Sequence, residues 1–204
     1  MKKTNKNIEV EIRGPLTKRE YLNLERFLKK NGRFVQKKDR VLIDYSSESL
    51  ESRENDIRLR VTNKIPEIVI KTGKLGGSDE RREISVLTKK NNFDNLVKIF
   101  AALGFKKGIL CVRKGNIYDY KGVEFSVVEV PGHSFYFEVE KLIDNNKDKE
   151  VAKLELIKMC KQLKLKIFSN NGLFTYLRKL NSEANEMFDF KNYEDNYFQQ
   201  RFNL

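Results

Sequence analysis

Hydrophobic and charged residues alternate strictly in several short segments of the chain. Residues 8–13 read IEVEIR, residues 56–62 contain IRLRV, and residues 67–71 read EIVIK. Because successive side chains of a strand point to opposite faces, each segment is predicted to be a β-strand with one apolar and one charged face. Further strands are predicted at 34–45, 81–87, 109–120, 123–130 and 134–141. Strands therefore dominate the predicted fold.

Four other segments repeat their apolar residues at the 3.6-residue spacing of an amphipathic helix. Thr17 is a suitable N-cap for a helix that runs to about residue 30. Further helices are predicted at 93–101, at about 148–163 and near 173–180. Between these elements, Gly14-Pro15 is expected to end the first strand, Pro66 to break the chain before EIVIK, and residues 73–80 to form a flexible turn.

The predicted elements follow one another without a long Pro- or Ser-rich linker. Their order is a strand, a helix, about four strands, a second helix, three or four strands and then helices, which is typical of one α+β domain. We assign residues 7–180 to this domain and residues 181–204 to a C-terminal tail. The tail contains five acidic and two basic residues with scattered aromatics. A docked tail and a frayed appendage are both open alternatives.

The charges on the predicted strands are sorted by sign. Two residues of like charge share a strand face at Glu9 with Glu11, at Arg58 with Arg60, and at Glu138 with Glu140. Such residues lie about 7 Å apart, and their repulsion is relieved by a counter-ion. Two architectures produce this pattern, an open sheet with a solvated charged face or a closed barrel whose charges line a wet interior. The repeated like-charged pairs favour the barrel.

These charged residues indicate a particular ligand chemistry. Carboxylate oxygens suit Mg²⁺ or Mn²⁺, whereas arginine and lysine suit phosphate. Lys71, Arg81 and Glu83 extend the charged face onto two further strands. A zinc site is not expected, because the sequence offers only one histidine, His133, and two cysteines as zinc ligands. The pattern therefore predicts a site for a metal-bound polyphosphate.

Composition narrows the class of protein further. The 204 residues include 41 Lys+Arg and 29 Asp+Glu, which gives a formal net charge of +12, and 39% are hydrophobic. No apolar run approaches about 18 residues and no apolar leader is visible, so neither a membrane span nor a signal peptide is expected. Two cysteines fit reduced thiols in the cytoplasm.

The positive charge is compatible with nucleic acid as a partner, but the sequence contains no nucleic-acid-binding motif. Lysines such as Lys37 and Lys38 are expected on a solvated surface.

Five motifs resemble, in order and spacing, those of the CYTH proteins, also called triphosphate tunnel metalloenzymes: IEVEIR, IRLRV, VIKTG, RREIS and FEVEK. The likeness covers about residues 7–180. The family includes class IV adenylyl cyclases, thiamine triphosphatases and inorganic triphosphatases, and its relatives include RNA 5′-triphosphatases. The resemblance implies an α+β fold in which a closed eight-stranded antiparallel β-barrel forms a tunnel, with helices packed outside.

The resemblance also implies roles for individual residues. Glu83 matches the family's mid-chain acidic position and is the candidate catalytic residue. A triphosphate-containing small molecule is the expected partner, with Mg²⁺ or Mn²⁺ as cofactor. The expected metal ligands are Glu9, Glu11, Glu138 and Glu140, and the expected phosphate-binding residues are Arg13, Arg58, Arg60, Lys71 and Arg113.

Three positions depart from the family pattern. The second cation of a K-x-R pair falls on Gly115, unless a bulge there turns Lys114 inward, and a metal-associated aspartate falls on Val128. A second mid-chain glutamate is Ser85. The leading hypothesis is a divalent-metal-dependent hydrolase that cleaves a phosphoanhydride bond of an inorganic, nucleoside or thiamine triphosphate. The departures favour a non-catalytic module for polyphosphate or RNA 5′ ends, and a class IV-type adenylyl cyclase is a further alternative.

Overall fold

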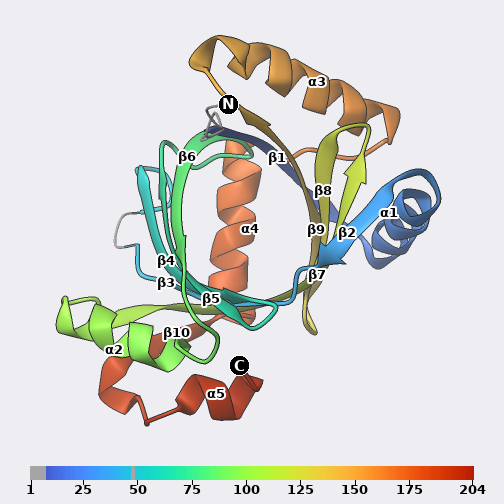
Figure 1. The fold of residues 1–204 in the computed structure, drawn as a ribbon. Coiled ribbons are helices and arrows are strands. Elements are labelled where there is room, and N and C mark those ends of the chain that lie inside the picture. The colour runs from blue at the N-terminus through green and yellow to red at the C-terminus, as the bar shows by residue number, and fades with distance from the viewer. Residues whose placement is uncertain (1–7, 47–48) are drawn as a thin grey trace, which may run out of the picture.

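Eight antiparallel strands close into a barrel in a computed structural model that describes residues 8–46 and 49–204 (Figure 1). Around the barrel the order is β7, β3, β4, β5, β6, β1, β9 and β8, and β8 pairs again with β7. The closed barrel with helices outside confirms the predicted fold class. The strands are β1 (Ile8–Leu16), β3 (Arg40–Asp44), β4 (Asn55–Thr62), β5 (Ile65–Thr72), β6 (Ser78–Leu87), β7 (Lys107–Tyr120), β8 (Val123–Val130) and β9 (Ser134–Ile143).

The long strand β7 closes the barrel. Its first half pairs with β3, where Val112 lies opposite Val41, and its second half pairs with β8, where Ile117 lies opposite Ser126. Two short strands, β2 (Arg33–Lys37) and β10 (Glu186–Asp189), also pair with β7 outside the eight-stranded cycle. A closed sheet leaves no unpaired edge around the barrel, so its interior is walled on all sides.

Two expected strand breaks are wrong. Gly14 and Pro15 continue β1 and pair with β9, and a side chain at Gly14 would collide with the Lys166 carbonyl oxygen and the Phe137 ring. Glycine therefore allows the backbone at Lys166 and the Phe137 ring to lie close to β1, and it does not end the strand. Pro66 is the second residue of β5, where it lies opposite Val61 of β4, and pairing with β6 begins only at Glu67. The predicted turn at 73–80 is also shorter, because β6 already starts at residue 78.

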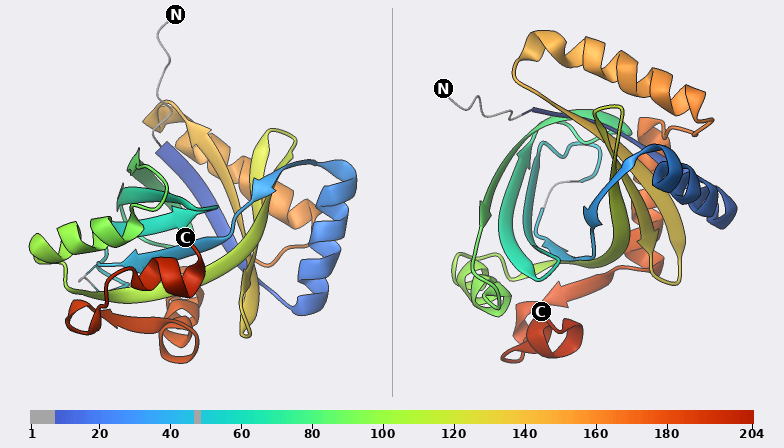
Figure 2. Two further views of the ribbon diagram at one scale, coloured as in Figure 1. Left: turned by 60° about the horizontal axis from the view of Figure 1, so that its bottom comes forward. Right: turned by 45° about the vertical axis from the view of Figure 1, so that its right-hand side comes forward.

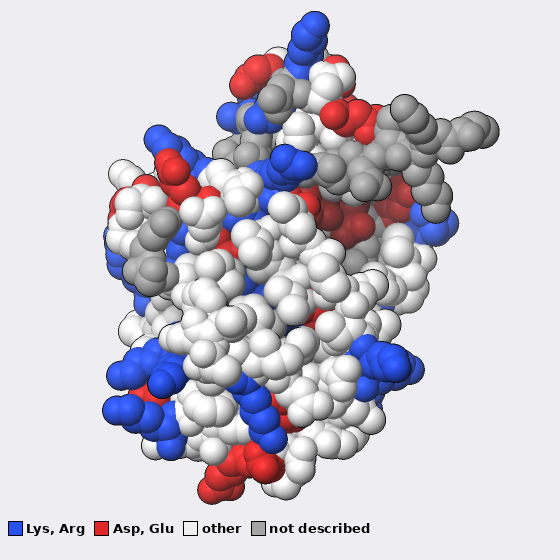
Figure 3. Space-filling view, turned by 60° about the vertical axis from the view of Figure 1, so that its left-hand side comes forward, with Lys and Arg blue, Asp and Glu red and all other residues white. Residues whose placement is uncertain are grey.

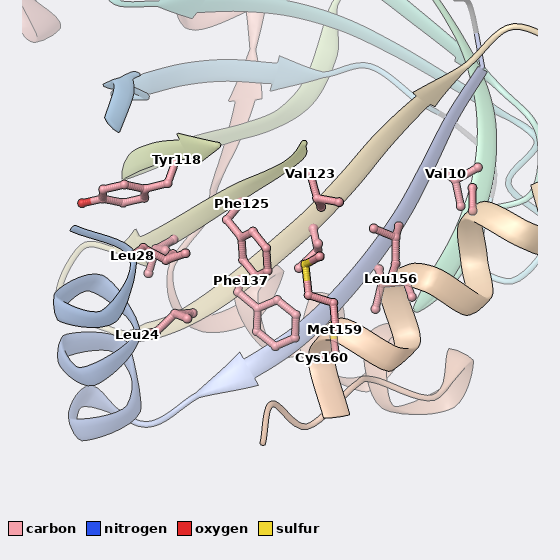
Figure 4. Packing of buried hydrophobic residues seen from close by; sticks show 14 of the residues in the cluster. Val10, Leu24, Leu28, Tyr118, Val123, Phe125, Phe137, Leu156, Met159 and Cys160 are labelled. Carbon is pink, nitrogen blue, oxygen red and sulfur yellow. The ribbon is translucent and has the colours of Figure 1, made fainter. Parts of the chain in front are cut away.

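Helices α1 (Lys18–Asn31) and α3 (Lys149–Gln162) cover one side of the barrel. A capping box between Thr17 and Glu20 starts α1 where the N-cap was expected. Apolar residues of both helices pack on the outer faces of β1, β7, β8 and β9, as Figure 4 shows for Leu28 and Leu156. The main hydrophobic core thus lies between strands and helices, which leaves the barrel interior free for polar side chains.

A second core joins α2 (Phe93–Ala102) to the C-terminal residues. Helix α5 (Tyr197–Phe202) lies beside α2, and Phe188 of β10 is buried with Phe198. The Asp94 carboxylate accepts hydrogen bonds from the backbone N–H groups of Phe198 and Gln199. Of the two alternatives for the tail, docking is the one that the structure shows. Two 3₁₀ turns, η1 (Asn146–Asp148) and η2 (Phe190–Asn192), complete the connections.

Helix α4 (Asn170–Glu183) lies across one end of the barrel, where Figure 1 shows it through the opening and Figure 2 shows it from two other directions. It extends beyond the residue-180 boundary suggested by the sequence, into the segment that leads to β10. Ser169 caps its N-terminus through a hydrogen bond from the Gly172 N–H. Its apolar residues Leu173 and Phe174 are buried against Leu75 from the β5–β6 connection.

The outer faces of β5 and β6 are only partly covered by helices. Ile84 and Val86 are 55% and 58% exposed, although the sequence pattern places them on an apolar face. Figure 3 shows, on this side of the molecule, a broad surface of uncharged residues with charged groups scattered around it. Every helix among the described residues is too short or too polar to cross a lipid bilayer.

Candidate functional site

The charged strand faces meet inside the barrel. On the β1–β9 pair, Glu11 lies opposite Glu140 and Arg13 lies opposite Glu138. On the β8–β9 pair, Glu124 lies opposite Glu140. The glutamate pairs from the two ends of the domain are therefore neighbours, because β1 and β9 are adjacent strands. Barrel closure converts two distant sequence motifs into one surface.

Lys71 on β5 connects several of these acidic groups. Its ammonium forms an ion pair with Glu9, lies 3.1 Å from an oxygen of Glu83 and lies 4.0 Å from an oxygen of Glu11. Burial of Glu83 opposes its ionisation, but the charges of Lys71 and Arg60 outweigh burial and lower its pKa to about 2. Glu83 is therefore ionised at neutral pH and does not hold a proton for general acid catalysis in this state.

Arg60 is neutralised by carboxylates. Its guanidinium donates to Glu67 and to Glu83, at 2.5 and 2.9 Å. Glu67 lies on the adjacent strand β5 and Glu83 on the next strand, β6, so Arg60 reaches across β5 and orients Glu83 in the present geometry. Its expected role as a direct phosphate ligand stays a prediction.

Asp56 was missed in the sequence although it lies two residues before Arg58, on the same strand face. Its buried carboxylate accepts hydrogen bonds from Arg53, Arg58 and Arg81. Burial opposes its ionisation, but the three arginines hold its pKa well below the usual range. Asp56 thus anchors three cations with one carboxylate, and Arg53 also pairs with Asp44.

The expectation that Lys38 lies on a solvated surface is wrong. Its side chain points inward, 2.9 Å from the Ser126 hydroxyl and 3.5 Å from Glu138. Burial raises the cost of ionising Glu138, yet the charges of Lys38 and Arg13 lower its pKa. Lys38 lies in the connection between β2 and β3, where only barrel closure determines whether its side chain enters the interior.

Glu140 has the opposite electrostatic environment. Burial, together with the carboxylates of Glu9 and Glu124, raises its pKa to about 7 against the opposing charge of Lys38. Carboxylates gathered in this way repel one another when all are ionised. A divalent cation relieves that repulsion, so the donor chemistry of this part of the tunnel fits Mg²⁺ or Mn²⁺.

The expected metal ligands do not form a closed cage. Among the side chains that the structure describes, which exclude those of residues 78–80, no three His, Cys, Asp or Glu groups lie closely enough together to hold an ion. Glu9 is paired with Lys71, and Glu11 is paired with Arg13. A metal at these glutamates therefore requires the two cations to turn away.

Arg40 and Arg113 lie opposite each other on β3 and β7. Arg40 donates to the Thr62 hydroxyl, while Arg113 donates to its neighbouring carbonyl and to the Asn185 side chain. Among the described residues, neither arginine has a carboxylate partner. Burial and the charge of Arg60 lower the pKa of Arg40. Two adjacent arginines bonded only to neutral groups favour binding of an anion.

A cavity of about 160 Å³ lies between these cations and α4. Of the ten residues expected from the sequence, four line it, namely Arg13, Arg58, Arg113 and Glu138. The other six belong to the carboxylate-rich part of the interior. They are connected by the ion pairs of Lys71 and Arg60 and by the pairing of β1 with β9, and they are Glu9, Glu11, Arg60, Lys71, Glu83 and Glu140. Arg40, Lys38, Arg53 and Arg81 also line the cavity and were absent from the expected site.

Two of the three family departures lie on one pair of strands, whereas Ser85 lies on β6. Gly115 on β7 lies opposite Val128 on β8, and the register around them is regular from residue 114 to residue 120. Lys114 is exposed, so no bulge turns it inward. A side chain at Gly115 would come 2.9 Å from the Val127 carbonyl oxygen, which is too close. Neither position supplies a charge to the interior.

A closed barrel with acidic and basic groups buried along its inside defines a charged-tunnel protein. Residues 7–172 match the model of the CYTH domain, and the chain belongs to this family. A candidate adenylate cyclase of Methanocaldococcus jannaschii is 26% identical over 164 residues, which cover 78% of this chain and 90% of that protein.

Solved structures support the same fold. A protein of Pyrococcus horikoshii has a TM-score of 0.66 and 23% identity, with 84% of this chain and 99% of that chain covered. A Hippeastrum protein, described as a candidate adenylyl cyclase with a dominant triphosphatase activity, has a TM-score of 0.51 and 12% identity, with 83% and 95% covered. At these identities the likeness concerns the fold alone.

Proposed function

We propose that the protein is a divalent-metal-dependent hydrolase that cleaves a phosphoanhydride bond of a triphosphate inside the barrel. The observation that carries the proposal is the adjacent pair Arg40 and Arg113, for which the described residues supply no ion pair, close to cations gathered on Asp56. A wall of arginines binds several phosphate oxygens at once. It also stabilises the negative charge that develops on the leaving phosphate. Family membership supports the same class of ligand.

The proposal gives each group of residues a task. Glu9, Glu11, Glu138 and Glu140 would hold Mg²⁺ or Mn²⁺, which supplies Lewis-acid activation of a phosphoryl oxygen or of water. The cations Arg13, Arg58 and Arg113 bind and orient the phosphates. Lys71 and Arg60 keep Glu83 ionised, and Glu83 in turn positions Lys71 toward the interior.

Phosphate release from tripolyphosphate, ATP and thiamine triphosphate tests this function directly. Purified protein with Mg²⁺ or Mn²⁺ is expected to release phosphate, and EDTA is expected to abolish release. The variant Arg40→Met is expected to raise KM at least tenfold, because a buried charge–phosphate contact is lost. Arg178→Met, on the exposed face of α4, serves as its matched control. Absence of turnover with every triphosphate and both metals would refute hydrolysis.

A non-catalytic phosphate-binding module is the second candidate. Gly115 and Val128 supply no charge to the interior, and two of the four expected metal ligands, Glu9 and Glu11, are paired with Lys71 and Arg13. This alternative predicts that tripolyphosphate raises Tm without turnover. The relationship to the M. jannaschii protein adds cyclisation of ATP as a third reaction. Chromatography of the nucleotide products distinguishes a cyclic nucleotide from ADP and phosphate.

A further inference from the structure

The cavity beside α4 has two chemically different walls. The barrel contributes Arg40, Arg58 and Arg113 beside some apolar residues, while α4 and the segment before it contribute mainly apolar side chains. An inorganic polyphosphate is charged on all sides, and contact with apolar surface removes its hydration without compensation. A ligand suited to both walls has phosphate at one end and an apolar or aromatic group at the other. The apolar wall consists of Phe168, Leu173, Tyr176, Leu177 and Leu180.

The apolar wall is held in a fixed orientation. Phe168 and Tyr176 are stacked, with ring centroids 5.1 Å apart and an interplanar angle of 29°. The Tyr176 hydroxyl lies 2.8 Å from the Ser134 hydroxyl at the start of β9, and Tyr136 contacts the Tyr176 ring edge-on. Aromatic rings fixed in this way offer a planar ligand group a preorganised surface.

Amide groups lie where the two walls meet. Asn185 accepts a hydrogen bond from Arg113 and donates one to Asn181, at 3.0 and 2.8 Å, and both asparagines line the cavity. The charged part of a ligand is therefore directed to Arg40 and Arg113, and its uncharged part is directed along α4. The family match ends at residue 172, so most of this wall lies beyond the matched region.

We infer that α4 forms a binding site for the organic group of an organic triphosphate, with phosphate bound by Arg40 and Arg113. The inference rests on the proposed function for the position of the triphosphate in the tunnel. It adds that the protein distinguishes an organic triphosphate from tripolyphosphate, and that Leu177 is a specificity-determining residue. A nucleoside base and a thiamine ring share the required chemistry, namely a flat and largely apolar group joined to phosphates.

Binding and turnover are measured separately to test this inference. Calorimetric titrations in EDTA give Kd for tripolyphosphate, ATP and thiamine triphosphate, and phosphate release with Mn²⁺ gives turnover. At least one organic triphosphate is expected to bind tenfold more tightly than tripolyphosphate, the order of effect that one well-filled apolar contact produces. Leu177→Gln is expected to remove this preference, while Leu177→Met retains it. Leu154→Gln, at an exposed site on α3, is the control.

The outcomes separate the inference from the proposed function. A preference for an organic triphosphate that Leu177→Gln abolishes supports the α4 site, even where no turnover occurs and hydrolysis is refuted. The α4 site is overturned, and hydrolysis is left intact, by equal binding of all three ligands that Leu177→Gln does not change. The circular dichroism of this variant must match that of the wild type.

Should Leu177→Gln unfold, Leu177→Trp replaces it, since a larger side chain fills the cavity. Loss of the preference in this variant supports the site, and an unchanged preference overturns it.

Discussion

The guanidinium of Arg113, on the inner face of β7, donates a 3.0 Å hydrogen bond to the side-chain oxygen of Asn185, which follows α4. The C-terminal segment thus holds an arginine of the tunnel in place from outside the barrel strands. Docking of that segment through β10, Phe188 and Phe198 fixes the position of Asn185. Residues beyond the family match therefore contribute to the geometry of the candidate site.

Asn185→Leu is expected to weaken triphosphate binding three- to tenfold, because Arg113 loses the group that orients it. The loss is expected in KM, with a smaller change in kcat, since the charge of Arg113 remains. Steady-state kinetics with Mn²⁺ and tripolyphosphate measure this effect. Asn192→Leu, at an exposed position of the same segment, is the control. An unchanged KM for Asn185→Leu would contradict the positioning role.

Asp56→Asn is expected to destabilise the fold by about 3–5 kcal/mol, the usual cost of breaking a buried ion pair by removing one partner. Its carboxylate is fully buried and is shared by Arg53, Arg58 and Arg81, so its removal takes away an anion that all three cations contact, although Arg53 keeps its ion pair with Asp44. Urea unfolding measures the free energy difference. Asp39→Asn, half exposed near the start of β3, is expected to change stability by less than about 1 kcal/mol. A similar loss in both variants is the contrary outcome.

Stability of the metal-free protein is expected to fall as the pH rises from about 5 to about 8. The folded protein raises the pKa of Glu140 from 4.5 to about 7, so the folded state binds a proton that the unfolded state releases. The resulting stabilisation, up to about 3 kcal/mol, is complete below pH 4.5 and is lost above pH 7. The pKa values of Glu83 and Glu138 are lowered, and their contributions change only at more acidic pH.

Glu140→Gln is expected to remove most of this slope, because glutamine stays neutral throughout the range. Thermal unfolding between pH 5 and pH 8, in EDTA, gives the comparison. Glu150→Gln, on the exposed surface of α3, controls for the change of residue type. Equal slopes for wild type and Glu140→Gln would show that Glu140 titrates as an ordinary carboxyl group.

Mn²⁺ is expected to raise the Tm of wild-type protein at pH 8 and to have a smaller effect in Glu9→Gln. A cation bound to ionised carboxylates stabilises only the folded state, and each lost carboxylate weakens binding. A Tm titration over Mn²⁺ concentration yields the apparent Kd of each protein. The same apparent Kd in Glu9→Gln and in wild type would exclude Glu9 as a metal ligand.

The sequence by itself determined the charged and apolar faces of the strands. Period-two alternation is a local property of the chain, so IEVEIR and IRLRV specify which side chains share a face wherever those strands lie. The order of the motifs indicated the family and, through it, the barrel. The capping residue Thr17 specified the start of α1. The alternation and the helix cap depend on residues that are close in sequence.

Only the tertiary structure decided which charges neutralise one another. Arg40 and Arg113 become neighbours through the β3–β7 register, and Lys38 enters the interior because the barrel closes there. Pairing of Lys71 with Glu9 likewise depends on side chains from β5 and β1, which β6 separates. Long-range register follows from the closure of the whole sheet, and electrostatic energy depends on distance in space. A pattern read along one chain therefore identifies candidate charges, whereas the fold determines which of them remain available to a ligand.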